Sequence, residues 1–301
     1  MKDMLLEKRK SVQTFISQYA KVTIFVLLLL LGFLFIYFIF VFISPQKLRV
    51  SFLDVGQGDA ILIQTPSGKS MLIDGGPNNL ISTRLSERMN YFNRDIDVVV
   101  ATHPDADHIT GLISVLEKYK IHTIIISKAD SDTDVSKSLE KSIIDEQADI
   151  HVAHTGDTID FHDGVVVSIL YPDKNYIAKK SDTNDVSVSV VIKYGDESFL
   201  LTGDLPEKEE SNLLQEILPR HVTVYKAGHH GSKYSSGEKL LSYIKPEYAI
   251  ISAGKDNRYG HPNIETLDRL KIYAKEIIST IDRGTISFIT DGRMMEIKTS
   301  R

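Results

Sequence analysis

The segment of residues 101–108, Ala-Thr-His-Pro-Asp-Ala-Asp-His, restricts the fold of this chain more than any other. Before it, the apolar run 96–101 predicts a buried strand, and after it apolar residues at helical spacing predict a helix over 109–119. Two imidazoles and two carboxylates therefore share a tight loop between a strand end and a helix start. Such a loop turns several side chains toward one point, and these groups are ligands of zinc and manganese.

A simple helix cap is the alternative interpretation of this loop, with Asp107 as the capping residue and the histidines in solvent. A cap needs one such side chain, whereas the loop supplies four polar candidates: His103, Asp105, Asp107 and His108. The sequence therefore favours a metal site over a cap.

The same arrangement, an apolar strand followed by a ligand-type residue beside a glycine, recurs three times. Asp74 follows one strand, Asp204 a second, and the pair His229 and His230 a third. Glycine lets the backbone bend or approach a bound group closely, and functional residues gather on loops. We expect the four loops to converge at one edge of the fold. Surface or structural roles are expected for the histidines outside them: His122, His151, His154, His162 and His221.

Apolar strands alternate with helical patterns along residues 47–301, which predicts an α/β fold of stacked layers. This length, about 250 residues, suffices for one such domain. Strands are expected over residues 48–53, 60–65, 69–73, 96–101, 123–127, 165–170, 186–194, 198–202, 222–226, 248–252 and 285–290, and helices over 82–93, 109–119, 136–147, 206–218, 238–244 and 263–273.

An apolar run without a charge covers residues 22–43. At about 1.5 Å per residue it reaches roughly 33 Å, enough to cross the apolar core of a bilayer. A cleaved signal peptide is the alternative, but its apolar region is usually about 7–15 residues long and ends at small residues, unlike Phe-Ile-Ser-Pro at 42–45. We expect a short basic cytoplasmic segment at 1–21, a transmembrane anchor at 22–43 and one domain at 47–301.

Basic residues set the expected orientation of this anchor. Five precede it and only Lys47 and Arg49 follow closely, so the positive-inside rule places the N-terminus in the cytoplasm and the domain outside the cell. The first 21 residues carry +3 of the net charge of −5, which leaves −8 on the rest. Such an acidic domain does not favour nonspecific binding to polyanions. Because the chain has no cysteine, a metal must be held by His, Asp or Glu.

Six short motifs occur in a fixed order along the chain, and the set is more informative than any one of them. They are residues 52–60 (FLDVGQGDA), 72–76 (LIDGG), 102–111, 201–204 (LTGD), 226–232 (KAGHHGS) and 259–262 (YGHP). This ordered set resembles the metallo-β-lactamase-fold hydrolases, and among them the hydrolase domain of the ComEC-type competence proteins for DNA uptake. The resemblance implies an αββα sandwich, preceded here by one transmembrane helix, with two divalent metal ions at one edge.

The resemblance also implies roles for residues at matching positions. His103 and Asp105 would hold the first metal, Asp107 and His108 the second, and Asp204 would bridge the two. A metal pair of this kind activates water and clamps a scissile phosphate or carbonyl.

Other positions complete this implied site. His229 or His230 would complete the second metal site, and His229 is the preferred candidate. Asp74 would orient the loop from behind the ligands. The residues implied in catalysis are Asp107, Asp204 and His261.

Two departures from the family pattern concern the first metal. Many members carry histidine where this chain has Asp105, a change shared by the ComEC-type branch, and the harder ligand moves preference toward manganese without excluding zinc. The ligand histidine usually found before Asp204 is absent, and Asn184 or Asp185 would replace it as a weak ligand.

The remaining polar residues near these motifs leave alternatives open. Asp54, Gln57 and Asp59 flank a glycine turn that is either an active-site loop or a tight hairpin. His261 either donates to a substrate oxyanion or caps the next helix, and we favour substrate contact. Exposed side chains beside the histidine pair either contact a phosphate or are only solvated: Lys226, Ser232 and Lys233.

The sequence thus predicts a membrane-anchored, outward-facing hydrolase with two zinc or manganese ions. A phosphodiesterase or nuclease is favoured because the resemblance implies it, with DNA or a cell-wall polymer such as teichoic acid as substrate. With a single predicted span, the chain does not itself predict an uptake channel. The alternatives are hydrolysis of a carbonyl substrate such as a β-lactam or lactone, and a non-catalytic membrane scaffold. No feature indicates a protein partner.

Overall fold

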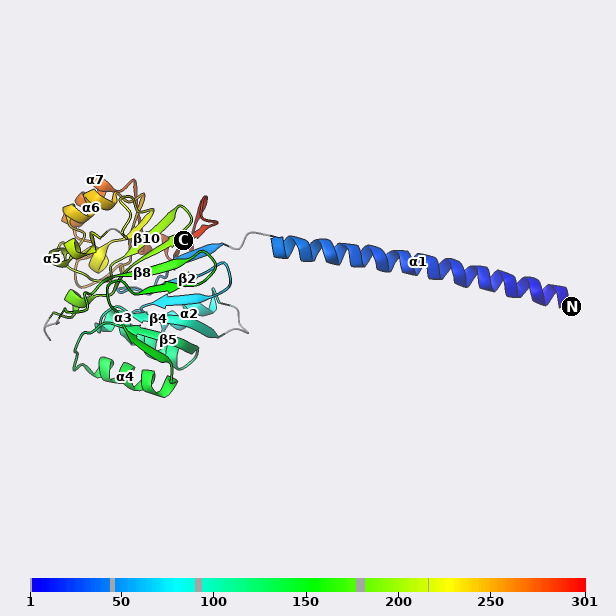
Figure 1. The fold of residues 1–301 in the computed structure, drawn as a ribbon, viewed down its shortest axis with the longest axis horizontal. Helices are drawn as coiled ribbons and strands as arrows, with labels where there is room; N and C mark the ends of the chain where they lie inside the picture. The colour runs from blue at the N-terminus through cyan, green and yellow to red at the C-terminus, as the bar shows by residue number, and fades with distance from the viewer. Residues whose placement is uncertain (1, 44–46, 90–93, 177–181, 216) are drawn as a thin grey trace. The chain divides into compact units, whose positions relative to one another are not determined.

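The structure is a computed structural model, which describes residues 2–43, 47–89, 94–176, 182–215 and 217–301. The chain forms two units, Met1–Pro45 and Gln46–Arg301. The first contains helix α1 (Lys2–Ile43), drawn in blue in Figure 1. Its segment Gln18–Phe38 is long and apolar enough to cross a membrane, with a mean hydropathy of 2.5, and it overlaps the predicted anchor. Membrane anchors and signal sequences both have this character.

The second unit is built on two mixed sheets. Within the described residues, one sheet has eight strands in the order β15-β14-β1-β2-β3-β4-β5-β6, and the other has seven in the order β13-β12-β11-β10-β9-β8-β7. The strands of the first sheet are β1 (Leu48–Phe52), β2 (Ile61–Gln64), β3 (Ser70–Ile73), β4 (Asp95–Ala101), β5 (Lys120–Ile126), β6 (Asp149–Val152), β14 (Ile286–Thr290) and β15 (Met295–Thr299).

The second sheet and the helices complete the unit. Its strands are β7 (Thr158–Asp160), β8 (Val166–Tyr171), β9 (Ser189–Tyr194), β10 (Glu197–Leu201), β11 (Val224–Lys226), β12 (Tyr248–Ile251) and β13 (Glu276–Ser279). The α-helices are α2 (Leu80–Ser86), α3 (Ala106–Leu116), α4 (Asp134–Glu146), α5 (Glu207–Glu210), α6 (Glu238–Ile244), α7 (Ile264–Tyr273) and α8 (Thr280–Arg283), and the 3₁₀ turns are η1 (Thr183–Val186), η2 (Ser211–Leu213) and η3 (Gly228–Gly231).

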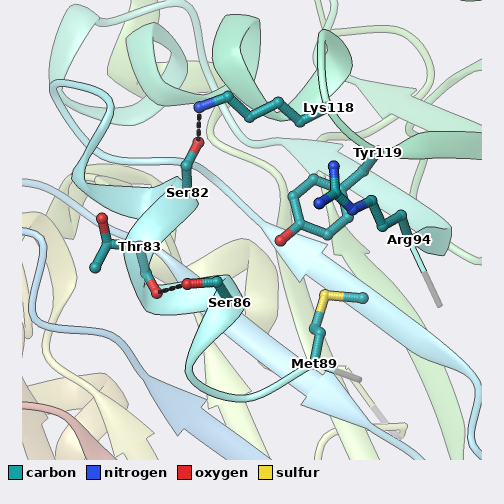
Figure 2. Close-up of a pocket in the computed structure, with 7 residues that line it drawn as sticks. All are labelled: Ser82, Thr83, Ser86, Met89, Arg94, Lys118 and Tyr119. Carbon is teal, nitrogen blue, oxygen red and sulfur yellow. Dashed lines mark hydrogen bonds between the residues drawn. The ribbon is translucent and has the colours of Figure 1, made fainter. Parts of the chain in front are cut away.

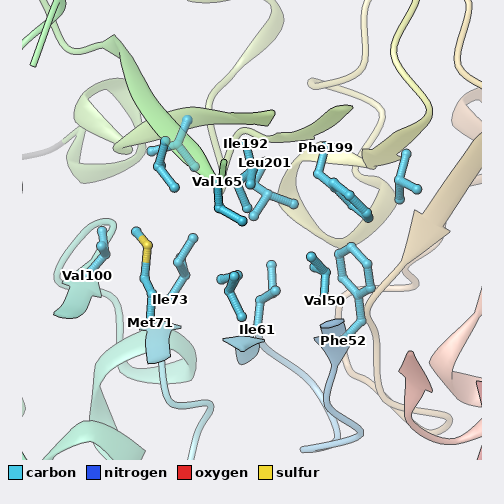
Figure 3. Close-up of a cluster of buried hydrophobic side chains, with 14 of the residues drawn as sticks. Val50, Phe52, Ile61, Met71, Ile73, Val100, Val165, Ile192, Phe199 and Leu201 are labelled. Atoms are coloured by element: carbon cyan, nitrogen blue, oxygen red, sulfur yellow. The ribbon is translucent and has the colours of Figure 1, made fainter. Parts of the chain in front are cut away.

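The main core lies between the two sheets, where apolar side chains of both face one another (Figure 3). Phe288 packs edge-on against Phe52 of its own sheet and against Phe199 of the other, with ring centroids 6.0 and 6.1 Å apart. Each fully buried side chain of this size contributes roughly 1.5–3 kcal/mol to folding. The inner faces of the sheets therefore hold the sandwich together.

Two further apolar clusters attach helices to the outer faces of the sheets. Helices α2, α3 and α4 pack on the eight-stranded sheet, and α6 and α7 pack on the other, as Figure 1 shows. The order of layers is helix, sheet, sheet, helix. The predicted αββα sandwich is confirmed.

Parallel strands bring the site loops together. Strands β3, β4, β5 and β6 are mutually parallel in one sheet, as are β10, β11, β12 and β13 in the other. Because the carboxyl ends of parallel strands meet at the same edge, the loops after β3, β4, β10 and β11 share one edge of the sandwich. These are the four loops in which ligand-type residues were predicted.

Most predicted elements are present, and the exceptions have physical reasons. Strands β6, β7, β13 and β15 were not predicted because they are short edge strands with at most one buried residue each, so they lack a long apolar run. The helix predicted over 206–218 is wrong. The chain makes only the short α5 and η2 there, because the Glu210 carboxylate turns inward to accept hydrogen bonds from the amides of Ser236 and Gly237. Of the helix predicted over 82–93, residues 90–93 lie outside the described residues.

Candidate metal centre

The loop between β4 and α3 places two imidazoles inside the protein. His103 and His108 are buried, at 1% and 0% exposure, so neither is solvated as the helix-cap interpretation requires. Asp105, not Asp107, occupies the N-cap position of α3, and its side chain makes no capping hydrogen bond. Its Oδ1 instead accepts a hydrogen bond of 2.7 Å from Thr183 Oγ1. The side chain of Asp105 therefore does not cap the helix, and these contacts do not support the helix-cap interpretation.

Asp74, at the end of β3, holds this loop in place. Its Oδ1 accepts from the Thr102 amide at 2.9 Å, and its Oδ2 accepts from Thr102 Oγ1 at 2.7 Å and lies 2.8 Å from His108 Nδ1. Since a carboxylate only accepts, the Nδ1 of His108 donates to Asp74, and its Nε2 is the ring nitrogen that faces Asp204. A carboxylate behind a histidine in this way fixes the ring for metal binding.

Asp204, which follows β10, is the centre of the arrangement. Its Oδ2 lies 3.3 Å from the Nε2 of His108, 3.5 Å from that of His229 and of His230, and 3.9 Å from that of His103. The carboxyl is 2% exposed. One buried carboxylate oxygen thus faces four imidazole nitrogens that come from two loops.

Several of these atoms have no hydrogen-bond partner among the described residues. They are Nε2 of His103, of His108 and of His230, and Oδ1 of Asp204. An unsatisfied buried polar atom costs about 1–3 kcal/mol, so three imidazole nitrogens without a partner that converge on Asp204 indicate a ligand-binding site. A divalent cation fits this donor set, because imidazole nitrogen and carboxylate oxygen are its usual protein ligands.

His230 is better buried than His229. Its ring is 0% exposed, its Nδ1 donates to the Ser252 carbonyl at 2.9 Å, and its Nε2 lies 3.4 Å from Asp107 Oδ2. The His229 side chain is 31% exposed. Both residues have positive φ, 48° and 56°, a backbone strain that is typical of functional sites. The geometry thus brings both histidines to Asp204 and gives His230 the inner position.

The pKa values reflect this crowding of charges. Burial lowers the pKa of His103 to about 3, and the neighbouring His108 contributes. The pKa of His230 is raised to about 9, because Asp204 and Asp59 outweigh the effect of burial, and that of His108 is raised for the same kind of reason. Without a cation the carboxylates thus retain protons on His108 and His230. A bound cation would displace these protons, which makes its affinity depend on pH.

Family comparisons agree with this geometry. The model of the metallo-beta-lactamase superfamily matches residues 53–166. The metallo-beta-lactamase fold protein YhfI from Bacillus subtilis superposes with a TM-score of 0.53 at 12% identity, over 81% of this chain and 100% of that chain. This chain is a metallo-β-lactamase-fold protein.

Sequence relatives place this metallo-β-lactamase-fold protein near the ComEC-type competence proteins. ComE operon protein 3 of Bacillus subtilis is 30% identical over 257 residues, which cover 79% of this chain and 32% of that protein. Competence protein ComA of Neisseria gonorrhoeae is 27% identical over 243 residues, with the same two coverages. The chain spans about a third of the length of these relatives.

Beneath the centre of this metallo-β-lactamase-fold protein lies a buried ion pair that the sequence did not reveal. Lys226 was predicted to be exposed, but it is fully buried, with its Nζ 2.5 Å from Asp59 Oδ2 and 3.9 Å from Asp204 Oδ1. Burial raises the pKa of Asp59, but the charges of Lys226 and His230 more than offset this and keep it below its usual value. Ser232, also predicted to be exposed, is 2% exposed, whereas Lys233 is exposed.

The glycine-turn residues divide between the two roles left open. Asp59 belongs to the buried group of Asp59, His108, Asp204 and His230 that fits a metal ion. The loop is brought there by Gly58, where a Cβ atom would lie 2.1 Å from the Asp107 carbonyl oxygen. Asp54 instead pairs with Arg84 and Arg301, and Gln57 accepts from the Gly254 amide. The two are structural in these contacts.

The position of the absent family histidine is taken by η1. Asp185 is engaged by the ammonium of Lys208 and is 7% exposed. The Oδ1 of Asn184 is buried and has no partner among the described residues. Because Thr183 of the same turn donates to Asp105, η1 lies beside the first predicted metal position. Asn184 is therefore the better candidate for a weak oxygen ligand there.

His261 borders the centre on its open side. Its ring centroid is 5.4 Å from that of His229, and burial followed by the charges of His229 and His230 lowers its pKa to about 4. Asn257 fixes its backbone by accepting from its amide at 2.9 Å and donating to its carbonyl at 2.6 Å. A neutral imidazole in this position fits contact with a substrate.

The histidines that were expected to lie outside the site do so. His122, His151, His162 and His221 are exposed and His154 is partly exposed. A further pocket of about 240 Å³ lies where Arg94 precedes β4, at the opposite end of that strand from the metal loop (Figure 2). Among the described residues, its lining includes no histidine and no carboxylate. It therefore offers no usual ligand for a divalent cation.

Proposed function

We propose that this protein is a metal-dependent hydrolase that cleaves phosphodiesters. The observation that carries the proposal is the buried Asp204 Oδ2, which faces four imidazole Nε2 atoms at 3.3–3.9 Å. A pair of divalent cations in such a site activates water and stabilises the charge that develops on a scissile group. The side chains around Asp204 would hold these cations and orient the substrate between them.

The proposed ligands fall into two groups that share Asp204. His103 and Asp105 would hold the first metal, with Asn184 as a weak additional ligand. Asp107, His108 and His230 would hold the second, since the three converge on the same side of Asp204. Manganese and zinc are the proposed ions, because the donors are imidazoles and carboxylates.

Phosphodiester chemistry is favoured over carbonyl hydrolysis for two reasons. The similarity to Competence protein ComA supports nucleic acid as the substrate. The carboxylate of Asp105 also makes the first position more anionic than an imidazole would, and so better suited to a hard ion that binds phosphate. A cell-wall polymer joined by phosphodiesters would suit the same chemistry. A carbonyl substrate and a catalytically inactive scaffold are the remaining alternatives.

We also propose that α1 anchors the protein with the domain outside the cell. The five basic residues before the apolar segment and the two after it support this orientation. Since the chain has no cysteine, single cysteines introduced at Ser11 and at Ser300 would report the topology. A membrane-impermeant maleimide applied to intact cells should label only the second, and labelling of the first alone would reverse the orientation.

Hydrolysis of bis-p-nitrophenyl phosphate by the full chain in detergent tests the proposed activity. The protein would be stripped of metal, reloaded with manganese or zinc, and compared with Asp107→Ala. We expect metal-dependent turnover that the variant loses. Two bound metals without turnover would favour a carbonyl substrate, and less than one bound metal per chain would favour the scaffold.

A further inference from the structure

Two exposed tyrosines stand on loops that border the metal centre. Tyr234 is 67% exposed and Tyr259 is 50% exposed. Each has a cation beside its ring: Lys233 Nζ lies 5.1 Å from the Tyr234 centroid, and Arg258 Cζ lies 5.0 Å from that of Tyr259. We call these four residues the tyrosine rim. Aromatic rings that are exposed beside a site, each with a cation next to it, offer a surface for a ligand that carries both flat rings and negative charge.

Tyr259 is connected to the centre through a row of rings. Its ring stacks on that of His261, with centroids 5.9 Å apart and an interplanar angle of 17°. His261 in turn lies 5.4 Å from His229, whose Nε2 is 3.5 Å from Asp204. The pKa of Arg258 is raised, first by its hydrogen bond to Tyr259 and also by the charge of Asp107. Ring contacts therefore connect Tyr259, and with it Arg258, to the histidines of the centre.

Tyr234 stands on the loop that follows the histidine pair, and hydrogen bonds fasten this loop to the segment that follows Tyr259. It follows His230 by four residues, so their Cα atoms are at most about 14 Å apart. The two loops are fastened to each other: the Asn263 amide donates to the Gly231 carbonyl at 2.9 Å, and Thr266 Oγ1 donates to the Ser232 carbonyl at 2.8 Å. The tyrosines are thus presented on a fixed frame, which lowers the entropy cost of binding.

The charges of the rim distinguish it from the rest of the domain. Residues after the apolar run carry a net charge of −8, yet neither Lys233 nor Arg258 forms an ion pair with a carboxylate within the described residues. The one other cation–ring pair of the described structure, Arg220 with Tyr243, lies where the chain enters β11, at the far end from the histidines. Two of three such pairs are therefore at the metal edge.

We propose that the tyrosine rim is a subsite that stacks unpaired nucleobases of a single-stranded nucleic acid as it enters the metal centre. Tyr259 and Tyr234 would each take a base, while Arg258 and Lys233 would contact the adjoining phosphates. The proposal rests on the proposed phosphodiesterase function and narrows its substrate. A polymer of phosphate and sugar alcohol has no aromatic ring to stack on the tyrosines. Its binding would be strengthened only by contacts of its phosphates with Arg258 and Lys233.

Binding by the full chain in detergent, reloaded with manganese, tests this subsite. The probes are a fluorescent oligothymidylate of about 12 nucleotides with phosphorothioate linkages, which resist hydrolysis, and a base-free oligomer of the same length and linkage. Fluorescence anisotropy would give both affinities. We expect the wild-type chain to prefer the oligothymidylate, and Tyr259→Ala and Tyr234→Ala each to weaken it by about fivefold or more without weakening the base-free oligomer.

Matched variants separate stacking from charge and from misfolding. Tyr259→Phe keeps the ring and should retain most of the preference. Arg258→Gln and Lys233→Gln should weaken both probes alike, because phosphate contacts do not depend on bases. Arg220→Ala, a cation beside a ring at the other edge, should change neither affinity. Metal content and thermal unfolding of each alanine variant would show that the fold is intact.

Each outcome separates this proposal from the proposed function. Equal affinity for both probes, or alanine variants that bind like wild type, would overturn the subsite. If bis-p-nitrophenyl phosphate is still hydrolysed in that case, the phosphodiesterase stands and a base-free polymer becomes its substrate. If tyrosine-dependent preference for bases is found but no phosphodiester is cleaved, the subsite stands and the hydrolase proposal fails.

Discussion

Two carboxyl groups six residues apart are equally buried but have opposite pKa shifts. Asp204 and Glu210 are each 2% exposed. Burial raises the pKa of both, but around Asp204 the charges of His230 and His108 reverse this and hold it well below its usual value. Around Glu210 the amides of Gly237 and Ser236 and the charge of Arg269 oppose burial too weakly to reverse it, and its pKa is raised to about 7. Burial alone therefore does not identify a metal ligand, whereas converging imidazoles do.

Among the substitutions considered, replacement of Asp204 by asparagine should reduce the affinity for the metal most strongly. The variant keeps the size of the side chain but removes the charge that faces four imidazole nitrogens. Loss of one partner from a buried charged group costs about 3–5 kcal/mol, so metal affinity should fall by at least about 100-fold. Isothermal titration of the stripped protein with manganese measures it. Glu210→Gln is the matched control, and a similar loss there would mean that Asp204 has no special role.

The pKa of Glu210 predicts a change of stability with pH. A carboxyl whose pKa is raised from 4.5 to about 7 in the folded state stabilises the fold fully below pH 4.5 and loses this contribution as pH rises through 7. At 1.36 kcal/mol per pH unit the loss amounts to about 3 kcal/mol. Urea unfolding of residues 47–301 without metal, at pH 5 and pH 8, measures it.

The Glu210→Gln variant isolates this effect from other titrations. Its amide stays neutral, so its stability relative to wild type should improve as pH rises from 5 to 8. A difference between the two proteins that does not change with pH would mean that Glu210 is ionised throughout, as two backbone donors at 2.6 and 2.8 Å allow.

Substitution of Asp74 tests whether a carboxylate that contacts a ligand candidate, but not the metal, also affects metal affinity. It contacts the ligand candidate His108 through Nδ1 at 2.8 Å and fixes Thr102 beside it. Loss of a carboxylate behind a metal-binding histidine typically costs about 10–100-fold in metal affinity. We expect Asp74→Asn to fall in this range, below the effect of Asp204→Asn. Unchanged manganese affinity by the same titration would remove His108 from the ligand set.

The sequence indicated the positions of the site loops because their signal is local. An apolar strand, a glycine and a ligand-type residue occur together at Asp74, at Asp204 and at the histidine pair, and parallel pairing brings these strand ends to one edge. The αββα sandwich was predicted from the resemblance of these motifs to a known family.

The features that sequence reasoning missed depend on contacts between distant segments. The burial of Lys226 follows from its pairing with Asp59, which comes from the loop between β1 and β2 in the other sheet. Likewise, Glu210 turns inward because the amides of Ser236 and Gly237 lie opposite it. A lysine or glutamate in a polar stretch carries no local sign of such a partner, so both were expected on the surface or along a helix.

Substitution of Asp105 should have the smallest effect of those predicted here, a change in the preference between zinc and manganese. Its side chain is 40% exposed and lies 3.8 Å from His103 Nε2, at the outer side of the centre. Asp105→His restores the imidazole that many family members carry and removes one negative charge near Asp204. The affinity for zinc relative to manganese should then rise, because imidazole is the softer ligand. The gain should stay below about tenfold, since exposed charges contribute about 1 kcal/mol or less. Competition between the two metals, measured by metal content at equal concentrations, gives the ratio, and a shift toward manganese would place Asp105 outside the ligand set.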